Sequence, residues 1–100
     1  MANASFADLI NSDTPVLADF HAEWCGLCKT MKPILEELKQ LTGDRVKIIK
    51  IDVDRNPAVS GRYNIQGVPT LILFRNAEIK WRQSGAVPTQ YLKRVIDEHA

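Results

Sequence analysis

The sequence predicts an α/β fold, a sandwich of helices on a mixed sheet that ends in an antiparallel hairpin. Short apolar runs typical of strands alternate with segments whose apolar residues recur at helical spacing. The last two strand-like runs are separated only by a short turn, which is typical of a hairpin. A chain of 100 residues, 45% hydrophobic and with a net charge of +1, has the size of one domain, so we expect residues 1–100 to form a single domain.

The first half of the chain carries the signals of a short helix, a strand and a long helix. Ser5 and Asp8 have the spacing of a capping box, which begins the short helix. The apolar run 16–20 is short enough for a buried strand. Apolar residues then recur at helical spacing over 25–42, and Gly43 is placed to end that helix.

The second half predicts a strand, a short helix, a hairpin and a closing helix. β-branched residues are frequent in 46–53, and Asn56-Pro57 begins a short helix that extends to Tyr63. The runs 71–74 and 79–83 flank a turn without the usual glycine. The prediction is therefore four strands and four helices. The closing helix has its apolar face on Tyr91, Leu92, Val95 and Ile96.

Charge and hydropathy exclude several classes of protein. The 13 basic and 12 acidic residues are interspersed, without the basic stripe that binding to nucleic acid requires. No apolar stretch approaches the roughly 20 residues of a membrane span. The first residues lack the features of a signal peptide, so we expect a cytoplasmic protein, although removal of an export signal would leave the same start.

Cys25 and Cys28 are the only cysteines, and they lie at the predicted start of the long helix. Two residues between cysteines at a helix start bring the sulfurs within bonding reach and leave the first thiol at the positive end of the helix dipole. The pair is a candidate redox pair, and a structural pair of buried cysteines is the alternative. A metal or iron–sulfur site would need four ligands, and the chain has only these cysteines and two distant histidines, so we expect no metal.

Several short stretches, spread over nearly the whole chain, form a specific pattern. They are Asp19-Phe20-His21-Ala22-Glu23-Trp24-Cys25-Gly26-Leu27-Cys28-Lys29, Pro33, Asp54-Arg55-Asn56-Pro57, Gly67-Val68-Pro69-Thr70 and Gly85-Ala86. This pattern resembles the thioredoxin family. The resemblance implies the thioredoxin fold, a three-layer α/β/α sandwich, and a thiol–disulfide oxidoreductase that reduces protein disulfides. It also implies no bound cofactor, and a flavin-dependent thioredoxin reductase as the partner that returns electrons.

The resemblance assigns chemistry to two cysteines and two charged residues. Cys25, exposed in the family, would attack a protein disulfide as a thiolate, and Cys28 would resolve the mixed disulfide that results. Asp19 would serve Cys28 as general base, and Lys50 on the neighbouring strand would tune its charge, unless Lys50 is an ordinary exposed lysine. A carboxylate in an apolar strand is costly in any fold, so burial should raise the pKa of Asp19.

A second set of residues would bind the substrate. Val68-Pro69 resembles the family's cis-proline loop, in which Val68 would offer its N–H and C=O to an extended substrate beside the sulfurs. The alternative is that Pro69 merely begins a strand. A flat apolar surface that binds many partners weakly would be completed by Trp24, Gly67, Gly85 and Ala86.

Two departures from the family pattern lie near the cysteines. Leu27 stands where the family usually has proline. With Cys25 as N-cap and Gly26 as the first helical residue, the backbone N–H of Leu27 is available to the Cys25 sulfur, which predicts a lower thiol pKa and a more oxidising potential than with proline. His21 stands where the family more often has tryptophan. By strand alternation it shares a face with Asp19, so it would relay protons or report pH, or pack with one hydrogen bond.

The start of the chain is a third departure. Only five residues precede Phe6, which leaves no room for the edge strand that usually opens this fold. The strand 46–53 would then be an exposed edge, protected in part by Lys47 and Lys50. We expect a monomer in which this edge is a candidate site of self-association.

Leu27 and His21 leave other functions open on the same fold. A non-catalytic binding module would keep the substrate surface and lose turnover. A variant biased toward oxidase or isomerase activity would keep the cysteine chemistry and change the direction of electron flow. A protein-disulfide reductase is the expected function.

Overall fold

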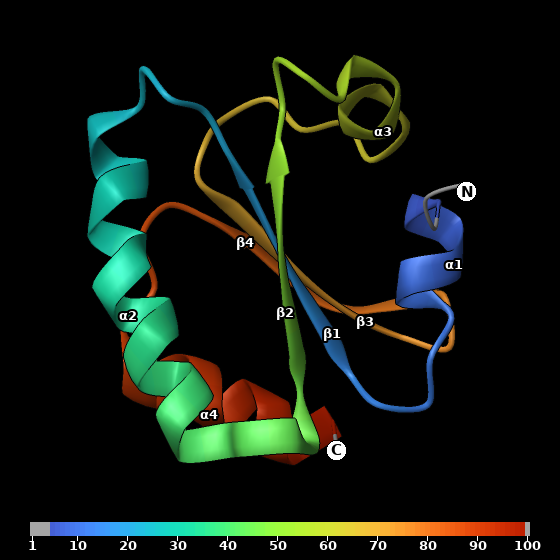
Figure 1. The fold of residues 1–100 in the computed structure, drawn as a ribbon, viewed down its shortest axis with the longest axis vertical. Helices are drawn as coiled ribbons and strands as arrows, with labels where there is room; N and C mark the ends of the chain where they lie inside the picture. Colours follow the sequence, from blue (N-terminus) through green and yellow to red (C-terminus); the bar gives the residue numbers. More distant parts are fainter. Residues whose placement is uncertain (1–4, 100) are drawn as a thin grey trace.

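The computed structural model describes residues 5–99 and forms a three-layer α/β/α sandwich (Figure 1). Its strands are β1 (Val16–His21), β2 (Lys47–Asp52), β3 (Thr70–Arg75) and β4 (Glu78–Ser84), in the sheet order β2-β1-β3-β4. β1 pairs parallel with β2 and antiparallel with β3, and β3 pairs antiparallel with β4. The predicted mixed sheet with a closing hairpin is therefore confirmed.

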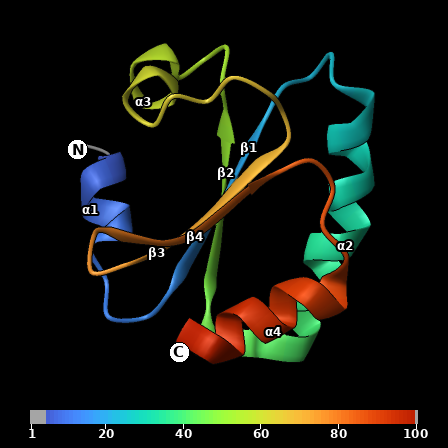
Figure 2. The same cartoon turned by 180° about the vertical axis from the view of Figure 1, so that it is seen from behind.

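Four helices of the described chain cover the two faces of this sheet. They are α1 (Phe6–Ile10), α2 (Gly26–Thr42), α3 (Pro57–Arg62) and α4 (Thr89–His99), with a single 3-10 turn, η1 (Gly43–Arg45), after α2. Helices α2 and α4 lie on one face, and α1 and α3 lie on the other, as the front and back views show (Figures 1 and 2). The predicted order of elements is confirmed, and their bounds differ from prediction only at terminal residues.

Local sequence signals explain where the helices begin and end. The Ser5 hydroxyl accepts from the Asp8 N–H at 3.1 Å, and the Asp8 carboxylate accepts from the Ser5 N–H at 3.4 Å, so the predicted capping box is present. Gly43 follows the last residue of α2 with a φ of 55°, in the left-handed region that glycine adopts without strain.

The turn between β3 and β4 forms without glycine because its two central residues adopt positive φ themselves. Asn76 has a φ of 52° and Ala77 has a φ of 67°. Asparagine tolerates this region, whereas alanine is strained in it. Two tertiary hydrogen bonds hold the turn: the Asn76 N–H donates to the Ser12 carbonyl at 2.8 Å, and the Ala77 N–H donates to the Ile10 carbonyl at 3.0 Å.

The sheet separates two apolar cores, because alternate residues of the buried strands β1 and β3 point to opposite faces. The core under α2 and α4 contains Leu17, Met31, Leu35, Leu38, Val46, Leu71, Leu73, Val87, Leu92, Val95 and Ile96. The core under α1 and α3 contains Ile10, Val16, Ala18, Phe20, Ile72 and Phe74, with Phe6, Val59 and Tyr63 packed against it.

Strand β2 is an edge of the sheet within the part of the chain that the structure describes, as expected for 46–53. Its residues are partly to fully exposed, and Lys47 and Lys50 are among the exposed ones. The expectation that no edge strand opens the chain concerns residues 1–4, which lie outside the described residues. Between residues 5 and 99, no helix is both long and apolar enough to span a membrane.

Candidate active site

Cys25 and Cys28 form a disulfide at the start of α2, with their Cα atoms 5.3 Å apart. Cys25 is the N-cap of the helix in an extended conformation, and its sulfur accepts a hydrogen bond from the Cys28 N–H at 3.1 Å. A capping sulfur receives donors of the first helical turn and the positive end of the helix dipole, both of which favour a thiolate. The geometry suits a reversible redox pair.

Two details near the sulfurs differ from the expectations. Cys25 is only 6% exposed, whereas the resemblance implied an exposed residue. Its sulfur is bonded to Cys28 and lies 3.5 Å from the Val68 carbonyl oxygen, and these neighbours screen it from solvent. The hydrogen-bond donor to this sulfur is also not the expected one, because the Cys28 N–H donates to it in place of the Leu27 N–H. The Leu27 side chain itself is exposed.

Asp19 lies in the middle of β1 and is 4% exposed. Its Oδ1 has no hydrogen-bond partner among the described residues. Burial raises the pKa of the Asp19 carboxyl above its ordinary value, and the nearby His21 and Lys50 oppose that rise through their charge. The direction agrees with the prediction from the sequence.

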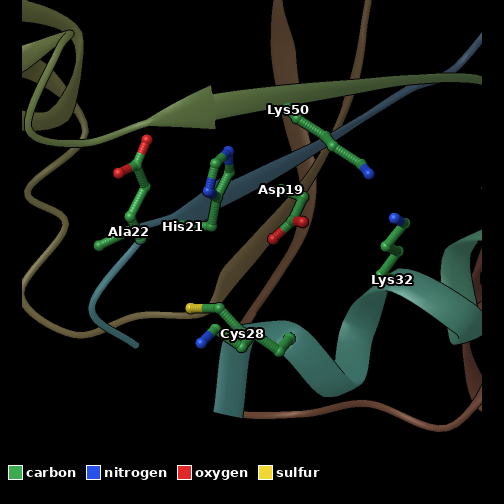
Figure 3. A pocket seen from close by; sticks show the side chains of 8 residues that line it. Asp19, His21, Ala22, Cys28, Lys32 and Lys50 are labelled. Atoms are coloured by element: carbon green, nitrogen blue, oxygen red, sulfur yellow. The ribbon is translucent and has the colours of Figure 1, made fainter. Parts of the chain in front are cut away.

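An open pocket of about 350 Å³ gathers Asp19, Cys28, Lys50 and His21 from three elements. Lys50 of β2 is the register partner of Asp19 in β1, and His21 follows two positions along the same strand face. Figure 3 shows the Asp19 carboxylate directed toward the side of the pocket where Cys28 enters from α2. The pocket lining is completed by Ala22, Glu23, Lys29 and Lys32.

The predicted substrate surface is built from two loops on the other side of the disulfide. The Val68–Pro69 peptide bond is cis, as expected, and the Val68 carbonyl faces the Cys25 sulfur. The Gly85 N–H donates to the Pro69 carbonyl at 2.8 Å, and Gly85 adopts a φ of 93° to make this approach. Gly67 and Ala86 are exposed beside these contacts. A hydrogen bond therefore joins the two loops, and each loop exposes one small residue next to it.

Trp24 projects from this surface with 72% of its area exposed, and one hydrogen bond fixes the position of its indole. Its Nε1–H donates to the Asp54 carboxylate at 2.9 Å. The Asp52 carboxylate in turn accepts from the backbone N–H groups of Asp54 and Arg55, which shapes the loop after β2. The sequence analysis did not predict the role of Asp54 as the acceptor for Trp24. Two aspartates, Asp52 and Asp54, at the end of a strand are nevertheless typical of a loop that is held by side-chain hydrogen bonds.

A shallow apolar hollow next to Trp24 was also missed. It is lined by Trp24, Val53, Ile65, Gln66, Gly67 and Val68. Val53 and Ile65 come from segments far apart in the sequence, and no local pattern indicates that they meet. No cluster of three or more His, Cys, Asp or Glu side chains suited to a metal ion is found within residues 5–99.

Comparisons with known proteins agree with this geometry. The family model described as Thioredoxin matches residues 1–98. Thioredoxin of Bacillus subtilis is 43% identical over 88% of this chain and 85% of its own length. Thioredoxin of Haemophilus influenzae is 41% identical over 91% of this chain and 85% of its own length. The solved structure of oxidized mitochondrial thioredoxin 3 from Saccharomyces cerevisiae has a TM-score of 0.82 at 35% identity, over 92% of this chain and 86% of that chain.

The fold, the disulfide at the helix start and these relatives favour the oxidoreductase over the non-catalytic binding module. Protein disulfides are accordingly its class of substrate. The chain belongs to the thioredoxin family and is a thiol–disulfide oxidoreductase of the protein-disulfide reductase class.

Proposed function

We propose that Cys25 is the attacking residue and Cys28 the resolving residue of a disulfide reductase that uses Asp19 as its base. The observation that carries this assignment is the asymmetry of the two sulfurs. The Cys25 sulfur caps the helix and faces the Val68 carbonyl, whereas Cys28 lines the pocket that contains Asp19. This asymmetry supports attack by the Cys25 sulfur and transfer of the Cys28 thiol proton to Asp19.

In the first step, the Cys25 thiolate attacks one sulfur of a substrate disulfide. The new bond joins Cys25 to that sulfur, the substrate bond breaks, and the other substrate sulfur leaves as a thiolate that takes a proton from water. The N-cap position stabilises the Cys25 thiolate relative to the thiol. The Val68 backbone would pair with the extended substrate as an added strand, next to Trp24, Gly67, Gly85 and Ala86.

In the second step, Cys28 releases the substrate. The Asp19 carboxylate accepts the Cys28 thiol proton, directly or through water, and the Cys28 thiolate attacks the Cys25 sulfur. The mixed disulfide breaks, the substrate leaves with two reduced sulfurs, and the protein keeps the Cys25–Cys28 disulfide that the structure contains. A carboxyl whose pKa is raised by burial suits this exchange, because it accepts a proton more readily than an ordinary carboxylate does.

Each turnover leaves this protein oxidised, so a second protein must return the electrons. By family likeness we assign that role to a flavin-dependent thioredoxin reductase. A reductase of this kind works where thiols are kept reduced, which supports a cytoplasmic location. We further propose that the protein acts as a monomer, with the exposed edge β2 as its candidate surface for self-association.

Ellman's reagent separates the two steps. Attack by Cys25 releases one coloured thionitrobenzoate, and resolution by Cys28 releases the second, so stopped-flow absorbance of the reduced protein should show two phases. Cys28→Ser should retain the first phase and lose the second. Asp19→Asn should slow only the second phase at neutral pH. If Cys25→Ser keeps a fast first phase, Cys28 attacks and the assignment is wrong.

A further inference from the structure

The pocket beside Cys28 contains a titratable group that the proposed steps do not use. His21 lines this pocket together with Asp19 and Cys28, and it lies on the same face of β1 as Asp19 (Figure 3). Its side chain is half-buried, so solvent protons reach it. Within residues 5–99 its imidazole makes no hydrogen bond or ion pair.

Burial and the lack of a donor make the ionisation of Asp19 depend on the charges of its neighbours. Asp19 is 4% exposed, and its Oδ1 has no hydrogen-bond donor among the described residues. When Asp19 is ionised, the charges of neighbouring cations stabilise its carboxylate. Because little solvent reaches the buried carboxylate, a change in the charge of one such neighbour is only weakly screened.

Among the basic residue types that line the pocket, only histidine ordinarily changes its charge near neutral pH. Lysine stays protonated there, whereas an unperturbed imidazole titrates near pH 6.5. Glu23 is an exposed carboxylate on the loop after β1 and is bound to Arg55. The charged or titratable groups that face the pocket are Asp19 and His21 from β1, Glu23 from the loop, Cys28, Lys29 and Lys32 from α2, and Lys50 from β2.

We propose that His21 is a positioning residue for the resolving step, one that makes the basicity of Asp19 follow pH. When the imidazole is protonated, it stabilises the Asp19 carboxylate and weakens it as a base. When the imidazole loses its proton, Asp19 holds a proton more strongly and takes it from Cys28 more readily. The inference rests on the proposed role of Asp19. It adds a pH-dependent charge that tryptophan at this position would not provide.

The direct test is the titration of Asp19 in the oxidised protein, followed by carbon-13 NMR of its carboxyl group. The wild type should show two inflections at Asp19, one of which coincides with the ring-proton titration of His21. His21→Gln should show a single inflection, moved to higher pH, because the opposing cation is lost. His99→Gln is the matched control, since His99 is the other histidine and lines a different pocket; it should reproduce the wild type.

Kinetics add a readout that packing alone would not change. The second thionitrobenzoate phase of His21→Gln should fall about twofold more between pH 8 and pH 6 than that of the wild type, because Asp19 is then less ionised at pH 6. His21→Trp should behave like His21→Gln, which separates charge from size.

An Asp19 titration that is the same in His21→Gln and the wild type would overturn this inference, as would an equal change in His99→Gln. Failure of the base assignment is distinguishable, because it would appear as an unchanged second phase in Asp19→Asn whatever the NMR titration shows.

Discussion

Replacement of Asp19 by asparagine should stabilise the oxidised protein at neutral and alkaline pH. The side chain is 4% exposed and its Oδ1 lacks a donor among the described residues. An unsatisfied buried acceptor costs about 1 to 3 kcal/mol, and more when it is charged. Because asparagine removes the charge but still buries a polar amide, we expect a gain of about 1 to 2 kcal/mol in the free energy of unfolding at pH 8.

The pH dependence of this gain follows from the direction of the pKa shift. Burial raises the pKa of folded Asp19 above its ordinary 3.8, with His21 and Lys50 in opposition, so the folded state binds this proton more tightly than the unfolded state. The contribution of Asp19 to stability is therefore fully present below pH 3.8 and is lost as pH rises through the folded pKa. The advantage of Asp19→Asn should be absent at low pH and grow as pH increases.

Urea denaturation of the oxidised proteins between pH 3 and pH 9, with linear extrapolation to water, measures this difference. Asp97→Asn is the control with the opposite sign. Hydrogen bonds from Lys93 and Arg45 lower the pKa of Asp97, so its contribution is present above the unfolded pKa and lost as pH falls. A constant difference between Asp19→Asn and the wild type at all pH values would refute the reasoning, as would destabilisation by Asp19→Asn at pH 8.

Three further changes test other parts of the structure. Ala77→Gly should raise the free energy of unfolding by about 0.5 to 1 kcal/mol in urea denaturation, because glycine relieves the φ of 67° next to Asn76; a loss of stability would mean that the turn is not strained. Asp54→Ala should free the Trp24 indole and raise the KM for insulin reduction a few-fold at unchanged kcat, and an unaltered KM would show that this hydrogen bond does not support substrate binding. Leu27→Pro should leave the redox potential, measured by equilibration with glutathione, nearly unchanged, because the Cys28 N–H that donates to the Cys25 sulfur is retained. A fall of about 30 to 60 mV would contradict this and show that the Leu27 N–H stabilises the thiolate.

Local patterns in the chain were sufficient for the elements and for the redox pair. A capping box at Ser5, a glycine after Thr42 and alternating apolar runs each act over a few residues, so they are visible without knowledge of the fold. The same is true of Cys25 and Cys28, whose separation along a helix start places their sulfurs within bonding reach. The pKa direction of Asp19 was also predictable, because an acidic residue within an apolar strand is buried with its neighbours.

The sequence by itself therefore determined the order of elements, the cysteine chemistry and the family, since these depend on short-range spacing and on motifs. Tertiary structure alone decided which distant groups meet. The contact between Trp24 and Asp54, and the hollow where Val53 and Ile65 meet beside Trp24, join separate segments of the chain. Such contacts are fixed by how the buried faces of the sheet and helices pack together, and packing is a property of the whole chain.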